Sequence, residues 1–285
     1  DHWLTWFWTN EYELTVAAGP NGSVNSGAVD GWYTNGIVVT NILATPDGGY
    51  GFFLWSGVGV PEGQDMDNPL TVTMDQMRSL QANFASAVPQ TRYWNGTGLW
   101  ETAGAWSPAG MPVPWDAAVI QSGTSILAYA RYADSLVVGP GGTLQFTNWA
   151  AKLSVSNAVT IQSNGLVTLP PAFTTNQMSN HVHLICADLT IDPAGRINAD
   201  GRGFAHDNGP GKGAGGWHGG GGGYGGKGGW AYNEAGVPGV PNGVAEAPLH
   251  PGSGAGGAHG YGSEGGGPVR IEASGTVTIN GTITA

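Results

Sequence analysis

The chain has 285 residues, enough for two domains with separate cores. Only 10 % of the residues are charged, and 20 acidic against 9 basic residues give a formal net charge of −11. This charge argues against a nucleic-acid partner, which needs a basic surface, and against an anionic membrane surface. No stretch of 18 apolar residues occurs, so we expect no membrane insertion.

The first region, roughly residues 1–86, is predicted to form short strands separated by turns. Alternating or apolar segments occupy residues 13–16, 36–44, 50–55 and 70–74, and turn residues occupy 19–22 and 46–49. Residues 75–84 fit either a short helix or a last strand, and periodicity does not decide between them.

Several segments in this region, at fixed spacings, resemble a known family of domains. The segments are Ala44 to Phe52, Trp55-Ser56-Gly57, Asn68 to Asp75 and Ala82-Asn83-Phe84. Over about residues 10–85 they resemble the divergent internalin-type B-repeat, a module of bacterial surface proteins. The resemblance implies a β-grasp-like spacer or adhesive domain at residues 1–86 and no catalytic residues. A linker is expected at residues 87–93.

An aromatic segment precedes this module. Residues 2–9 read His-Trp-Leu-Thr-Trp-Phe-Trp-Thr, and a strand there is apolar on both faces. Such a strand needs burial on both sides. It either packs inside its own domain or docks on another subunit by strand addition.

The second region, residues 94–285, contains an irregular repeat. Each unit is apolar-x-apolar, a glycine turn and apolar-x-apolar, beginning at Leu136, Val159, Leu189 and Val277 with offsets of 23, 30 and 88. The first two offsets suit coils of a right-handed parallel β-helix, and an antiparallel sandwich is the alternative. The third gap is either one interrupted coil or several degenerate ones. The spaced tryptophans from Trp94 to Trp106 resemble the opening of autotransporter-like β-helices and are expected to cap the first coil.

Residues 201–268 hold 28 of the 51 glycines. We predict a large glycine-rich insertion between two coils, ordered by packing, similar to glycine-rich segments of large bacterial β-helical surface proteins. Its ligand-binding or packing aromatics are predicted to be Trp217, Tyr224, Trp230 and Tyr232.

Sequence reasoning assigns no catalytic residue, metal site or cofactor. Six of the seven histidines lie between residues 181 and 259, but their spacing matches no zinc motif. The single cysteine, Cys186, is expected to be a buried hydrophobe. A glycan-cleaving site would be built from one set of charged residues, and the sequence does not fix the distances between their side chains. The set is Asp188, Asp192, Asp200, Asp207 and Arg202.

The function expected from these features is structural. The sequence starts at Asp1 without a basic and apolar export signal. We expect that such a signal has been removed and that the processed product is located outside the cell or on its surface. We expect a secreted subunit of a bacterial filament or surface layer, polymerising with itself head to tail through its terminal strands. The alternatives are a carbohydrate-binding adhesin that recognises surface glycans, and a β-helix polysaccharide lyase or hydrolase. The predicted interface residues are Trp3, Leu4, Trp6, Phe7, Trp8 and Ile283.

Overall fold

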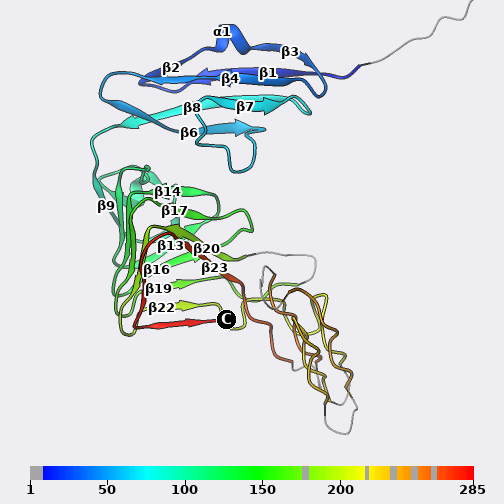
Figure 1. Ribbon diagram of the computed structural model, residues 1–285. Coiled ribbons are helices and arrows are strands. Elements are labelled where there is room, and N and C mark those ends of the chain that lie inside the picture. Colours follow the sequence, from blue (N-terminus) through cyan, green and yellow to red (C-terminus); the bar gives the residue numbers. More distant parts are fainter. Residues whose placement is uncertain (1–8, 175–179, 216–217, 232–235, 245–249, 258–261) are drawn as a thin grey trace, which may run out of the picture. The chain divides into compact units, whose positions relative to one another are not determined.

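The computed structural model describes residues 9–174, 180–215, 218–231, 236–244, 250–257 and 262–285. Those residues form an all-β protein, as predicted (Figure 1). The chain divides into two compact units between Pro89 and Gln90, and each unit is described by itself. Strand β9 (Thr91–Trp94) opens the second unit, so regular structure begins inside the segment assigned to a linker.

The first unit is built on a four-stranded mixed sheet. Its strands, in spatial order, are β3 (Gly31–Thr34), β1 (Glu11–Ala18), β8 (Arg78–Ser86) and β6 (Tyr50–Val58). The central pair β1 and β8 is parallel, and both edge strands are antiparallel to their neighbours. This order agrees with the expected β-grasp-like arrangement. Residues 78–86 are a strand because Arg78, Leu80, Ala82 and Phe84 alternate with exposed or half-exposed residues.

Two small sheets and one helical turn complete this unit. They are β2 (Gly22–Val24) with β5 (Ala44–Pro46), β4 (Val38–Ile42) with β7 (Leu70–Thr73), and α1 (Ser26–Val29). Leu14, Ile42, Trp55 and Leu70 pack in one apolar core. Arg78 is also buried, and its guanidinium donates hydrogen bonds to the Thr73 carbonyl at 2.8 and 3.0 Å, which compensates for its lost hydration.

The second unit is a parallel β-helix whose coils contribute one strand to each of three stacked sheets. The first sheet holds β11 (Trp106–Ser107), β9, β12 (Ala117–Ile120), β15 (Ser135–Val138), β18 (Ala158–Ile161), β21 (Asp188–Ile191) and β24 (Val277–Ile279). The second holds β10 (Thr97–Leu99), β13 (Gly123–Leu127), β16 (Gly142–Phe146), β19 (Leu166–Thr168), β22 (Arg196–Asn198) and β25 (Thr282–Thr284). The third holds β14 (Arg131–Ala133), β17 (Leu153–Val155), β20 (Val182–Cys186) and β23 (Val269–Ala273).

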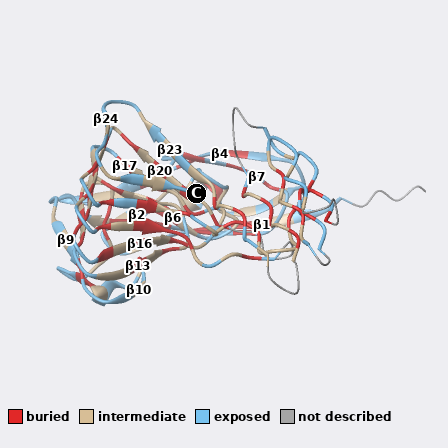
Figure 2. Ribbon diagram, turned by 90° about the horizontal axis from the view of Figure 1, so that it is seen from below, coloured by how far each residue is buried: buried red, intermediate tan, exposed pale blue. Residues whose placement is uncertain are grey.

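The predicted repeat residues stack on one another from coil to coil. Val138, Ile161, Ile191 and Ile279 occupy successive positions of the first sheet. A second ladder runs through Leu144, Val167, Ile197 and Ile283. In each ladder the first three residues are fully buried, whereas Ile279 is half-exposed and Ile283 is half-buried. Figure 2 shows buried positions alternating with less buried ones along the strands.

Parallel pairing decides two questions that the sequence left open. Every strand pair between successive coils is parallel, which rules out the antiparallel sandwich. Because β21 pairs directly with β24, the gap of 88 residues is one coil enlarged by the glycine-rich insertion. The connections from the second sheet to the third lengthen from coil to coil. They span residues 128–130, 147–152, 169–181 and 199–268.

Three tryptophans close the first end of the β-helix, as predicted. Trp94, Trp100 and Trp106 are buried, and their rings meet edge to face at centroid distances of 5.1 and 4.8 Å. Trp94 takes the ladder position next to Ile120, and the 3-10 helix η1 (Ala103–Ala105) leads into β11. The cap therefore covers apolar residues that the first coil would otherwise expose.

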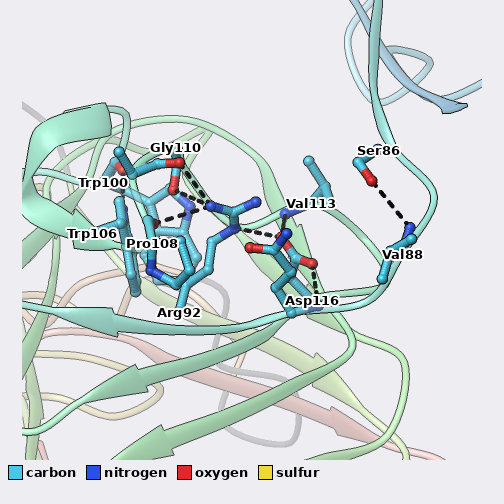
Figure 3. Close-up of polar contacts among 11 residues, drawn as sticks. Ser86, Val88, Arg92, Trp100, Trp106, Pro108, Gly110, Val113 and Asp116 are labelled. Atoms are coloured by element: carbon cyan, nitrogen blue, oxygen red, sulfur yellow. Dashed lines mark hydrogen bonds and ion pairs between the residues drawn. The ribbon is translucent and has the colours of Figure 1, made fainter.

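A buried ion pair fastens this cap (Figure 3). Asp116 is 1 % exposed, and its carboxylate accepts a hydrogen bond from Arg92 Nε at 2.5 Å and from the Gln90 amide at 2.9 Å. Arg92 Nη1 also donates to the Ala109 carbonyl at 2.9 Å. With both charges hydrogen-bonded, the pair holds the loop before β12 against the first strand of the helix.

Residues 199–268 leave the coil between β22 and β23 and form what we call the glycine bundle. Residues 220–223 lie at its centre. Gly221 donates to the Gly229 carbonyl at 2.8 Å and accepts from Gly239 at 2.8 Å, while Gly223 donates to Gly211 at 2.7 Å and Gly220 accepts from Gly256 at 2.8 Å. A strand in a sheet bonds only to the two neighbours in its plane. Four bonded neighbours around one short stretch therefore define a three-dimensional bundle of extended chains.

Backbone contact requires glycine at the bundle's crossing points. A Cβ atom on Gly239 would lie 1.8 Å from the Gly211 carbonyl oxygen, and one on Gly213 would lie 1.9 Å from that of Gly220. Residues 236–241 read Gly-Val-Pro-Gly-Val-Pro, with both glycines buried and both valines exposed. A period of three belongs to the extended polyproline-II-type helix, whose backbone bonds point outward to neighbours. The predicted ordering of the insertion by packing is thus borne out for its described residues.

Candidate interaction surfaces

The last of the described coils has an outer edge that no described strand covers. Val277 and Ile279 in β24 are 48 % and 50 % exposed, whereas Leu189 and Ile191, at the same positions one coil earlier, are 0 % exposed. Ile283, a predicted interface residue, lies half-buried on β25 and packs against the core. The edge of β23, β24 and β25 thus combines inward-facing apolar side chains with strand backbone that no described strand pairs on its outer side.

The other predicted interface residues lie outside the described residues, and the structure says nothing of them. They are Trp3, Leu4, Trp6, Phe7 and Trp8.

The aromatic residues predicted for the insertion divide into two groups. Trp217 and Tyr232 lie outside the described residues. Tyr224 is half-buried at a crossing of the bundle, where a Cβ atom on Gly243 would meet its ring at 2.6 Å. Trp230 is 55 % exposed, and Lys227 Nζ lies 4.7 Å from its ring centroid. Tyr224 therefore packs the bundle, and Trp230 is available on its surface.

A cavity of about 310 Å³ lies between the glycine bundle and the last coil. Its lining is mostly backbone and apolar: Tyr224, His250, Gly252, Gly266, Gly267, Pro268, Val269 and Ala285. The Tyr224 hydroxyl accepts a hydrogen bond from the His250 amide at 3.3 Å. With few polar groups pointing inward, this cavity offers little to fix a ligand's orientation.

Two of the acidic residues considered for a glycan-cleaving site, Asp188 and Asp207, make structural hydrogen bonds. Asp188 accepts the Thr276 amide at 2.6 Å and so fastens the turn before β24. Asp207 accepts the Gly257 amide at 2.7 Å within the bundle, and this bond lowers the pKa of its carboxyl. Among the described residues, no three His, Cys, Asp or Glu side chains are grouped to hold a metal ion. Cys186 is buried, as expected, and burial raises the pKa of its thiol.

A polar cluster that the sequence did not reveal lies on the outer face of the third sheet. His183 Nε2 and Arg270 Nε approach the same oxygen, Glu272 Oε1, at 2.7 and 2.9 Å. The hydrogen bond from His183, followed by the charges of Arg270 and Lys152, lowers the pKa of Glu272. His183 and Glu272 are 89 positions apart in sequence, so no local motif could have joined them. Only the coil register brings them together.

Two aromatic rings border this cluster. The His181 ring lies edge to face with Trp149 at 4.5 Å between centroids, and 5.4 Å from the ring of His183. Both His181 nitrogens are buried without a hydrogen-bond partner in the described part of the chain. Burial, followed by the charges of His183 and Arg270, lowers the pKa of His181 to about 4. His181 is therefore a neutral ring at neutral pH.

Comparisons with known proteins bear on the first unit only. Residues 12–88 match the family model of the divergent InlB B-repeat domain, in agreement with the resemblance found in the sequence. Comparison with curated proteins and with solved structures gave no match for the chain. None of the helices in the described part of the chain has the length and apolar character that a membrane span needs. The matched module indicates a bacterial surface protein.

Proposed function

We propose that this chain is a secreted structural component of a bacterial filament or surface layer and that copies join head to tail at the β23–β24–β25 edge. One observation carries the proposal: Ile279 is half-exposed at a ladder position that is fully buried in the preceding coils. Covering such an edge with another strand satisfies both its backbone groups and its apolar side chains.

The proposed donor is the aromatic segment of residues 2–9. Its alternation gives two apolar faces, which suits a strand buried between two layers. A donor and an acceptor on different parts of one chain make a heterologous contact, which produces fibres or rings. In this proposal the chain is not an enzyme and needs no cofactor.

Electron microscopy and analytical ultracentrifugation test this function. The full chain should form regular fibres or rings as its concentration rises. Ile279→Lys should abolish them because the charge would be buried in the joint, whereas Val240→Lys, an equal change at an exposed site of the bundle, should not. Deleting residues 1–9 should also abolish assembly. A full chain that stays monomeric at every concentration contradicts the proposal.

A carbohydrate-binding adhesin is the second candidate, and the exposure of Trp230 favours it. An exposed indole with one face beside Lys227 can pack against a sugar ring with its other face. Glycan-array binding by the full chain that is lost in Trp230→Ala and kept in Tyr129→Ala, a control at another exposed aromatic, would support this function.

A further inference from the structure

The polar cluster on the third sheet is part of a row of basic side chains that crosses three neighbouring strands. His183 on β20 is the register partner of Arg270 on β23. Lys152 directly precedes Leu153, whose partner is Leu184, so Lys152 lies beside His183 on the other side. A chain with only 9 lysines and arginines places two of them in this one row, on either side of His183.

Glu272 compensates for only part of this positive charge. It meets His183 Nε2 and Arg270 Nε through a single oxygen. The terminal nitrogens Nη1 and Nη2 of Arg270, and Nζ of Lys152, have no hydrogen bond or ion pair with any residue that the structure describes. The Arg270 side chain is 54 % exposed, so its free edge is open to solvent. The row therefore offers two cationic groups to an anion.

The spacing of these two groups indicates the kind of anion. Lys152 and Arg270 are separated by two strand intervals, about 10 Å, which is more than one carboxylate can span. The free end of a guanidinium accepts a carboxylate in a two-pronged hydrogen bond, and an ammonium binds a second acid group as a point charge. A ligand that engages both must carry acidic groups at intervals along its length.

The surroundings favour a sugar over a polyphosphate or nucleic acid. The Trp149 ring, which is partly exposed and meets His181 edge to face, borders the row and has apolar surface of the kind that packs against a saccharide ring. The row lies at the end of the third sheet where the chain enters β17, β20 and β23.

We infer that the outer face of the third sheet binds an acidic polysaccharide, with Arg270 and Lys152 holding carboxylates on separate sugar units and Trp149 packing against the intervening ring. Glu272 orients the Arg270 guanidinium through Nε and leaves its far edge free. This binding requires no assembly of copies, so it does not depend on the fibre proposed above.

Calorimetry on the full chain tests the inference with an oligogalacturonate as the probe. Lys152→Gln should weaken binding about tenfold, which corresponds to about 1.4 kcal/mol. Because the Lys152 ammonium makes no hydrogen bond or ion pair with the described residues, and the backbone bond from the Arg131 amide to the Lys152 carbonyl does not involve the side chain, this variant should fold normally. Arg270→Gln should weaken binding at least as much. Arg196→Gln, an equal charge change at an exposed position of β22 on the second sheet, is the control and should bind as the parent does.

The ligand side of the experiment uses three further probes. The fully methyl-esterified oligomer should not bind, and added salt should weaken binding of the free acid. The galacturonate monomer should bind more weakly than the oligomer because it cannot reach both cations. Equal binding of the ester and the acid would overturn the inference, as would a Lys152→Gln variant with unchanged affinity. A sulfated oligosaccharide or an oligonucleotide that binds more tightly than the oligogalacturonate would overturn the carboxylate assignment.

Discussion

The β-helix and the glycine bundle belong to one compact unit but pack by opposite means. In the coils, side chains fill the interior and each strand bonds its backbone to one neighbour on either side. In the bundle, the backbone itself fills the interior, and residues such as Gly213 and Gly239 touch the carbonyl groups of other segments. The coils therefore depend on having enough side-chain volume, and the bundle depends on having none.

Truncating a ladder residue should have the largest effect on stability. Ile191 is fully buried between Ile161 and Ile279, so Ile191→Ala should lower the free energy of unfolding by about 2–5 kcal/mol through lost burial and the cavity left behind. Urea denaturation measures this loss. A change below about half a kcal/mol would show that side-chain packing does not hold the coils.

In the bundle, adding side-chain volume should destabilise the fold, whereas in the coils removing it does. Gly239→Ala would place a methyl group 1.8 Å from the Gly211 carbonyl oxygen and should cost about 1–3 kcal/mol by overpacking. Hydrogen exchange should show faster exchange of the Gly221, Gly228 and Gly239 amides, with coil amides unchanged. Gly229→Ala is the matched control, because nothing lies within 4 Å of its added Cβ. Equal effects of the two changes would mean that close backbone contact is not what orders the bundle.

Truncating a ladder residue at the uncovered edge should cost less stability than truncating one in the middle of the same ladder. Ile279 belongs to the same ladder as Ile191 but is 50 % exposed, so Ile279→Ala should cost about 1 kcal/mol or less. Urea denaturation at high dilution, where copies are apart, measures it. At concentrations that promote assembly the loss should grow, and an equal loss at both concentrations would argue against a joint at this edge.

Acid should lower the stability of the β-helix through protonation linked to His181. The pKa of folded His181 is lowered from 6.5 to about 4, so the unfolded chain binds its proton first as the pH falls. Stability contributed by the neutral ring should therefore decline between pH 6.5 and 4 and stay level below. Urea midpoints across this range measure the decline, and His181→Phe should flatten it. An NMR titration midpoint for His181 near 6.5 would contradict the burial of its ring.

The sequence predicted more of the coils than of the bundle. The ladders are visible because Ile161, Ile191 and their partners repeat a local pattern of apolar-x-apolar around a glycine, and the tryptophan cap follows the same local logic. The B-repeat was found from spacings within about 75 residues. The bundle's architecture was not predicted, although the Gly-Val-Pro repeat at residues 236–241 is a period-three signal that could have indicated it.

The row of Lys152, His183 and Arg270 was missed for a different reason. Its members come from three coils of unequal length, so their offsets in sequence are irregular and carry no period. Register between coils is set by the apolar ladders, and only after the ladders are aligned do the outward residues fall into rows. Histidine spacing is a signal for metal sites, and it does not reveal a site made of Arg, Lys and Glu.

The connections from the second sheet to the third show where the β-helix accommodates added length. They grow from residues 128–130 to 199–268, while the turns at the other two corners stay short. Closing a longer loop costs little extra entropy once the strands on either side are held in register. This corner can therefore hold a longer connection without disturbing the stack, and it carries the glycine bundle. An engineer could replace residues 203–265 with a foreign epitope and keep the solenoid as its display platform, and natural variants should differ in length at this corner first.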